Sequence, residues 1–224
     1  MPNAGVTNKD VPNDDSMNDT FIELLSDMII QSNTESREHM WFVERYSSIL
    51  SRYYSKLYPR SRMSSKKQKL IANAARIHDV GKISMPDVLL TKMGTMSFNE
   101  FNLYKKHTIK GSQIIRSFSV GRDRDFERIC YNVCLYHHEK YDGSGYPYGL
   151  KADKIPIEAQ IVGLADIYDT LRHGGVPEPV SDNKAFYMIV NGKCGKISER
   201  LINCFEEARE ELEAVDISMM RGAG

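Results

Sequence analysis

Two adjacent histidines, His137 and His138, are followed at once by Glu139 and by a glycine-rich loop at 142–147. Residues 126–139 carry apolar side chains at helical spacing, so the pair stands at the end of a predicted helix. Glycine and proline directly afterwards stop the helix and turn the chain. Neighbouring imidazoles at such a turn can bind different metal ions. The fold therefore has to bring further ligands to this helix end.

Helical spacing of apolar residues recurs along almost the whole chain, and no stretch alternates apolar and polar residues as a strand does. Ser97 is followed three residues later by Glu100, which is the spacing of a capping box at a helix start. The sequence predicts an all-α protein with a helical bundle. The predicted helices cover residues from 19 onward, a second segment after Thr34, and residues 67–77, 126–139, 157–171, 184–190 and 197–215.

The chain of 224 residues is long enough for one helical domain with an arm. Residues 1–18 are rich in Asn and Asp and are predicted to be a disordered N-terminal arm. The predicted domain spans residues 19–215, and residues 216–224 are predicted to be a flexible C-terminal tail.

Charge and cysteine usage exclude several classes of protein. The 30 basic and 30 acidic residues cancel, which argues against a binder of polymeric nucleic acid. Cys130 and Cys134 are one helical turn apart, and the four cysteines form no C-x-x-C pair, so core packing in a reduced compartment is expected. No apolar run is long enough to span a membrane and no signal peptide is recognisable, so we expect a cytoplasmic protein.

Histidines and carboxylates stand at the ends or on one face of several predicted helices. Glu35 and His39 are four residues apart, so a helix places both on one side. The neighbours His78 and Asp79 can contact different ions, and His107 is expected near the middle of its own helix. The candidate metal ligands are Glu35, His39, His78, Asp79, His107, His137, His138 and Asp166.

Eight candidate ligands are more than one tetrahedral ion needs, so two or three divalent transition-metal ions are predicted. Imidazole and carboxylate ligands suit iron or manganese. Two such ions activate water and stabilise displacement at phosphorus, and Lys82 is placed to neutralise the developing charge. Asp79 and Lys82 are therefore the predicted catalytic residues. Glu139 and Glu158 either orient or cap other groups, or take part in function.

Three motifs together resemble the HD-GYP family of metal-dependent phosphodiesterases: H-D-x-G-K from His78, H-H-E-x-x-D-G-x-G-Y-P from His137, and A-D-x-x-D ending at Asp169. The resemblance covers about residues 19–215. It implies an HD-type helical bundle with a central metal site and hydrolysis of cyclic di-GMP to pGpG, often continuing to GMP. The matching residues are the ligands named above, with Glu35 as the carboxylate that accompanies a third ion, and Lys82 beside the scissile phosphate.

The resemblance also implies substrate contacts and partners. Loop 143–147 matches the signature loop that shapes the pocket and contacts diguanylate cyclase domains in the family. Residues 191–195 resemble the tail of members fused to a receiver domain, and a homodimer is possible. The predicted substrate-binding residues are Lys82, Gly143, Gly145, Tyr146, Asp169 and Arg172.

One segment departs from the family pattern. After A-D-x-x-D the family continues with S-x-R-x-Y-K, whose Arg and Lys bind the substrate phosphates, but this chain has Gly175 and Glu178 there. Each lost contact is worth about 1.5–3 kcal/mol, unless Arg172 or Lys184 compensates. Three hypotheses follow: an active cyclic di-GMP phosphodiesterase, a catalytically weak signalling or docking module, and an HD phosphohydrolase with another nucleotide substrate.

Overall fold

The computed structural model describes residues 14–92, 94–118, 123–174 and 178–222, and in this part of the chain every regular element is a helix. The prediction of an all-α fold is confirmed. The α-helices are α1 Asp14–Gln31, α2 Arg37–Leu57, α3 Ser65–Ala75, α4 Asp87–Leu90, α5 Phe98–Tyr104, α6 His107–Ser117, α7 Arg124–Tyr136, α8 Ile157–His173, α9 Asp182–Val190, α10 Glu199–Glu207 and α11 Arg209–Gly222. Short 3-10 helices are η1 Pro59–Ser61, η2 Val80–Ser84 and η3 Ala152–Lys154.

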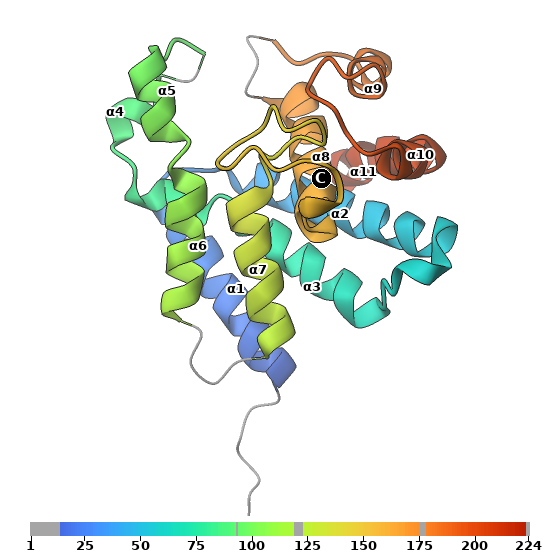
Figure 1. Ribbon diagram of the computed structural model, residues 1–224, viewed down its shortest axis with the longest axis horizontal. Helices are drawn as coiled ribbons and strands as arrows, with labels where there is room; N and C mark the ends of the chain where they lie inside the picture. The colour runs from blue at the N-terminus through green and yellow to red at the C-terminus, as the bar shows by residue number, and fades with distance from the viewer. Residues whose placement is uncertain (1–13, 93, 119–122, 175–177, 223–224) are drawn as a thin grey trace, which may run out of the picture.

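The two long helices α2 and α8 pack against each other at the centre of the molecule (Figure 1). On α2, Val43, Tyr46 and Leu50 recur at helical spacing and are fully buried. On α8, Ile161 and Leu164 belong to an apolar helix that is buried along most of its length. A helix covered on several sides has to be apolar on several sides, which explains why its sequence is so uniformly apolar.

The remaining helices cover this central pair on different sides. α3 packs on α2 and α7, and α6 packs on α7 and on η2. α10 and α11 pack on α2, and α9 packs on α8. α4 and α5 stand apart from the bundle at the upper left of Figure 1. The segment after α3, the start of α6 and the end of α7 lie close together beside α8, because Asp79 contacts His107 and His137 and His78 contacts Asp166.

The ends of the domain differ from the sequence prediction. α1 begins at Asp14, so residues 14–18 are helical rather than part of the predicted arm, and residues 1–13 lie outside the described residues. The predicted helix at 197–215 is two helices separated by Ala208, and α11 continues through residues assigned to the tail. No glycine or proline marks the break at Ala208, so the apolar pattern carries no sign of it.

Two local predictions are confirmed. Ser97 and Glu100 form the capping box of α5, with the Ser97 side chain accepting from the Glu100 amide and the Glu100 carboxylate accepting from the Ser97 amide. The four cysteines are free, and Cys130 and Cys134 are buried in the core. Among the described residues, no helix has the length and apolar character needed to cross a membrane.

Two glycines allow the backbones around the site to approach closely. A Cβ on Gly81 would lie 1.9 Å from the carbonyl oxygen of His107, and a Cβ on Gly163 would lie 2.2 Å from that of His137. Any side chain at either position would push two elements apart. Gly81 thus permits contact between η2 and α6, and Gly163 permits contact between α8 and the end of α7.

Replacing Gly163 by alanine should destabilise the protein by about 1–3 kcal/mol, because the new methyl group overpacks the contact with His137. Denaturant unfolding followed by circular dichroism measures this change. Gly174→Ala is the matched control, since a Cβ there meets nothing within 4 Å, and its expected effect is within about 0.5 kcal/mol. Equal effects of the two substitutions would contradict the close approach of α8 and α7.

Candidate metal centre

Three buried histidines, His78, His107 and His137, stand where helices end or begin, and each bonds through Nδ1 to a backbone carbonyl of the preceding helix. The accepting oxygens are those of Ala75 at 2.8 Å, Tyr104 at 2.7 Å and Val133 at 2.9 Å. A carbonyl only accepts, so each Nδ1 carries the proton and each Nε2 presents a lone pair. Ala75 and Tyr104 are the last residues of α3 and α5, so two of these bonds are made at helix ends, while the carbonyl of Val133 also accepts from the backbone amide of His137.

The prediction that His107 lies near the middle of its helix is wrong. His107 is the first residue of α6, and α5 ends three residues earlier at Tyr104. The imidazole donates a hydrogen bond to the carbonyl of Tyr104, which is the last residue of α5. His107 therefore resembles His78 and His137 in its setting.

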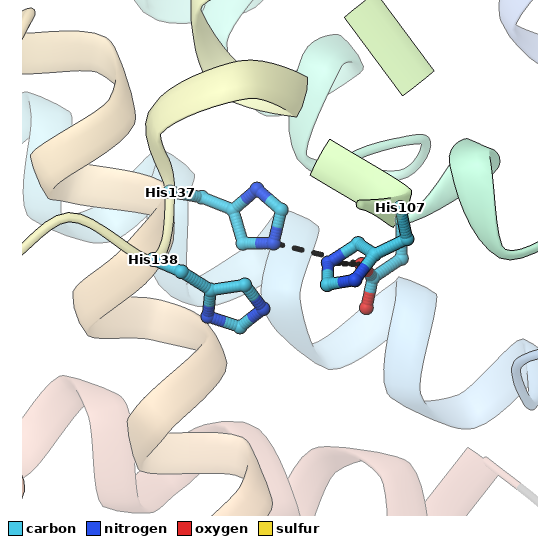
Figure 2. Close-up of side chains that lie close together, drawn as sticks. His107, His137 and His138 are labelled. Carbon is cyan, nitrogen blue, oxygen red and sulfur yellow. Dashed lines mark ion pairs between the residues drawn. The ribbon is translucent and has the colours of Figure 1, made fainter. Parts of the chain in front are cut away.

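Asp79 joins the histidines from both of its oxygens. Its Oδ1 lies 3.0 Å from Nε2 of His107 and 3.5 Å from Nε2 of His137. Its Oδ2 lies 3.3 Å from Nε2 of His78. Figure 2 shows the rings of His107, His137 and His138 lying close together. The carboxylate of Asp79 thus lies between three imidazoles.

His39 lies close to two more carboxylates, those of Glu35 and Asp166. Its Nε2 lies 3.7 Å from Oε2 of Glu35 and 3.7 Å from Oδ1 of Asp166. Asp166 Oδ1 is in turn 3.8 Å from Nε2 of His78. Glu35 precedes α2 rather than lying on it, because Ser36 caps the helix, but its carboxylate still reaches His39.

The buried atoms at this centre fit a cation. Nε2 of His78, His107, His137 and His138, and Oδ1 of Asp79, are buried without a hydrogen-bond partner among the described residues. Buried polar atoms are normally paired, and several lone pairs facing one another repel unless a positive ion lies between them. The 3.0 Å contact of His107 with Asp79 is such a meeting of lone pairs, because the proton of His107 is on Nδ1.

The pKa shifts of the histidines are also consistent with a bound cation. Burial lowers the pKa of His137 and of His138, which favours the neutral ring that a metal requires. Burial alone would also lower the pKa of His78, but Asp79 outweighs it and, with Asp166 and Glu35, raises that pKa to about 9. The carboxylates of Asp79, Asp166 and Glu35 therefore stabilise a positive charge in their part of the centre.

The eight predicted ligands fall into three overlapping groups whose ligand atoms lie within 4.8 Å of one another. Asp79 belongs to two groups and His39 to two, so neighbouring ions would share ligands. The groups are Asp79 with His107, His137 and His138; His39 with His78 and Asp166; and Glu35 with His39 and Asp79. The structure therefore brings together every residue that the sequence analysis names as a ligand.

The centre opens into a cavity of about 740 Å³, within the usual size range of small-molecule sites. Lys82 lines it and is itself buried, with Nζ 2.7 Å from Oδ2 of Asp79 and bonded to Glu35. Burial lowers the pKa of Lys82, but these two carboxylates outweigh burial and hold it well above its ordinary value. Lys82 is therefore a fixed positive charge at the floor of the cavity.

The glycine-rich loop is held over the centre by Glu139. Its buried carboxylate accepts from the amides of Tyr148 at 2.8 Å and Leu150 at 2.9 Å. This folds the loop back so that Tyr146 lines the cavity, its ring 4.6 Å from that of His138. Of the glycines predicted to bind substrate, Gly145 lies against the backbone at His138 and shapes the loop instead.

Two other predicted substrate-binding residues already bond to side chains of the protein, although Asp169 also lines the cavity. Asp169 is buried, and each of its carboxylate oxygens is hydrogen-bonded to a histidine. Oδ2 lies 2.6 Å from Nδ1 of His39, and Oδ1 lies 2.7 Å from Nδ1 of His173. Arg172 is ion-paired with Asp182 and bonded to the hydroxyl of Tyr168, and it is not among the described cavity-lining residues. Asp169 thus orients His39, and the guanidinium of Arg172 is engaged with Asp182 and Tyr168.

Some residues of the site were not identified from the sequence. His173 lines the cavity, as do Phe101, Tyr104 and Cys194. For His173 a signal exists, since it lies one helical turn after Asp169 on α8. By contrast, Glu158 is structural: it is buried and bonds Asn132 and Lys67, and so ties α8 to α7 and α3.

Replacing Asp169 by asparagine should lower the affinity for Mn²⁺ by about 10- to 100-fold, because an amide has only one acceptor oxygen where the carboxylate uses two, and His39 is then oriented less firmly. Calorimetric titration with Mn²⁺ measures the affinity, and circular dichroism checks the fold. Asp182→Asn is the control: this half-exposed carboxylate pairs with Arg172 outside the cavity. An Asp169→Asn variant that binds Mn²⁺ as tightly as the control would contradict the orienting role.

Comparison with known proteins agrees with this geometry. A family model described as HD domain matches residues 21–196. The chain is 30% identical over 208 residues to a "Probable cyclic di-GMP phosphodiesterase" of Vibrio cholerae, covering 91% of this chain and 47% of that protein. It is 38% identical over 130 residues to the "Cyclic di-GMP phosphodiesterase response regulator RpfG" of Xanthomonas campestris, covering 58% of this chain and 32% of that protein.

A third relative, the "3'3'-cGAMP-specific phosphodiesterase 2" of Vibrio cholerae, is 28% identical over 98% of this chain and 41% of that protein. The chain thus spans less than half the length of these relatives. Among solved structures, "Bd1817, a HDG"Y"P protein from Bdellovibrio bacteriovorus" shares the fold, with a TM-score of 0.57 and 21% identity over 87% of this chain and 62% of that one. As its resemblance to the HD-GYP branch predicts, the chain belongs to the HD domain family.

Proposed function

We propose that this chain is a metal-dependent phosphodiesterase that hydrolyses cyclic di-GMP to pGpG, to GMP or to both. The observation that carries the proposal is the shared position of Asp79, whose two oxygens face different histidines at the floor of a cavity that also holds Lys82. The names of the Vibrio cholerae and Xanthomonas campestris relatives support the same substrate.

The proposed ions are two or three in number, with iron or manganese as the metal, because the donors are imidazole nitrogens and carboxylate oxygens. One ion would be held by Asp79, His107, His137 and His138, and the others by the groups that include His39. Bound there, such ions would supply activation of water and neutralisation of charge at phosphorus.

The side chains around the ions have separate tasks. Lys82 holds its ammonium group beside Asp79, where it can bind a phosphate oxygen and stabilise the negative charge that develops in displacement. Tyr146 and Phe101, whose ring centroids are 6.1 Å apart, form an aromatic wall of the cavity. Aromatic rings of this kind stack on nucleobases without reading their sequence.

The segment after α8 favours the second hypothesis, a catalytically weak module. Glu178 is exposed and is not among the described lining residues, and Gly175 lies outside the described residues. Arg172, a candidate substitute for the missing cations, pairs with Asp182. Weak substrate capture combined with an intact metal centre is therefore our expectation, and contacts with a diguanylate cyclase or a receiver domain stay predictions from the resemblance.

Replacing Lys82 by methionine should lower kcat for cyclic di-GMP by about 100- to 1,000-fold, because a fixed charge at the reacting phosphate is lost. The measurement is turnover of metal-loaded protein with chromatographic detection of pGpG and GMP. Lys92→Met serves as the control, since Lys92 pairs with Glu100 on the surface. Unchanged kcat in Lys82→Met, with metal content retained, would contradict the role of Lys82.

A direct comparison of substrates decides between the first and third hypotheses. We expect hydrolysis of cyclic di-GMP with a higher kcat/KM than hydrolysis of 3',3'-cGAMP, although the relative with that specificity matches 98% of this chain. The two assays use the same metal-loaded protein. A preference for 3',3'-cGAMP would replace the proposed substrate and leave the phosphodiesterase reaction intact.

A further inference from the structure

Five carboxylate side chains line the described part of the cavity wall, and Glu38 is the one without an ion pair or hydrogen bond to another described residue. Each of the others lies within hydrogen-bond or ion-pair distance of a histidine; they are Glu35, Asp79, Asp166 and Asp169. Both carboxylate oxygens of Glu38 are therefore available to a ligand in the cavity.

Glu38 lies at the exposed part of the cavity, away from the buried metal ligands. It stands in the first turn of α2 and is exposed, whereas His78 and Asp79 at the metal centre are buried. A dinucleotide with one phosphate at the metal centre has to extend from this buried end toward the exposed part of the wall. The carboxylate of Glu38 is thus placed to meet a part of the substrate other than the reacting phosphate.

The chemistry of a free carboxylate decides which part of the substrate this is. A carboxylate repels a phosphate, but its two oxygens only accept hydrogen bonds and suit a group with two adjacent donors. Guanine has such a pair on its Watson–Crick edge, the ring N–H and the exocyclic amino group, and proteins read unpaired bases on this edge. Adenine has an acceptor beside its amino group there, so one carboxylate oxygen would face a lone pair.

Resting on the proposed function, we propose that Glu38 binds the Watson–Crick edge of one guanine base of the dinucleotide and thereby selects guanine over adenine. Phe101 and Tyr146 offer rings on which either base stacks, so the aromatic wall does not distinguish them. Hydrogen bonds to a carboxylate are charge-assisted and therefore among the stronger ones. Glu38 would supply the base specificity that stacking lacks.

A carboxylate in the first turn of a helix also has a role that involves no ligand, because it interacts favourably with the helix dipole. Glu199 holds the same position in α10: it is exposed, lies in the first turn and is not among the described lining residues of this cavity. Glu199→Gln is therefore the matched control, since it removes the same kind of charge from a helix start outside the cavity.

The test compares Glu38→Gln, Glu199→Gln and the unmodified protein, all loaded with metal, on cyclic di-GMP and cyclic di-AMP. Glutamine keeps the length of the side chain but offers one acceptor and one donor group, which matches adenine rather than guanine. In Glu38→Gln, kcat/KM for cyclic di-GMP should fall by about 10- to 100-fold, whereas kcat/KM for cyclic di-AMP should not fall. Glu199→Gln should equal the unmodified protein with both substrates.

Bis(p-nitrophenyl) phosphate, which carries no base, separates loss of base recognition from damage to the metal centre. All three proteins should hydrolyse it equally and hold equal amounts of metal. An unchanged kcat/KM for cyclic di-GMP in Glu38→Gln overturns the inference. So does a parallel loss of activity toward cyclic di-GMP and bis(p-nitrophenyl) phosphate, because that pattern shows an effect through the neighbouring ligand His39.

Failure of the proposed function has a different signature. Unmodified protein that does not hydrolyse cyclic di-GMP is not the proposed enzyme, and calorimetric binding of cyclic di-GMP then decides the inference by itself. Binding that weakens about 10-fold or more in Glu38→Gln, but not in Glu199→Gln, upholds the guanine contact. Absent binding, or equal binding by Glu38→Gln and the unmodified protein, overturns it.

Discussion

Hydrogen bonds from imidazole Nδ1 atoms to oxygen acceptors are the interaction on which the rest of this structure depends. His78 and His107 bond to carbonyls at the ends of α3 and α5, His137 bonds to Val133 near the end of α7, and His39 bonds to Asp169. Each bond satisfies an acceptor and directs Nε2 toward one centre. The same contacts that complete the helix ends thereby orient the candidate ligands, so fold and site are specified together.

This arrangement concentrates charge that is costly to bury. Asp79 is buried and lies close to Glu35, and Lys82 pairs with both of these carboxylates. Burying carboxylates is unfavourable unless cations and hydrogen bonds compensate. Close packing at Gly81 keeps η2, which follows Asp79, against α6. The bundle thus holds a negatively charged centre that bound metal ions would stabilise.

Periodicity and motif spacing were sufficient for the helical fold, the capping box at Ser97 and the convergence of all eight candidate ligands. They were insufficient where the decisive contact is distant in sequence. The bond between His39 and Asp169 joins residues 130 positions apart, and no local pattern contains it. Arg172 illustrates the same limit, because its ion pair with Asp182 across the loop decides where it points. His173 became recognisable as part of the site only once Asp169 and Phe42 were placed beside it.

The central claim is that the converging imidazoles and carboxylates form one multinuclear metal centre with Asp79 as its bridge. Elemental analysis of protein purified under low oxygen tests it most directly, with Asp79→Ala measured in parallel. The account predicts about two or three transition-metal ions per chain, and loss of most of them in Asp79→Ala while helical content is retained. A reproducible content of about one ion or less after reconstitution, or an unchanged content in Asp79→Ala, would contradict it.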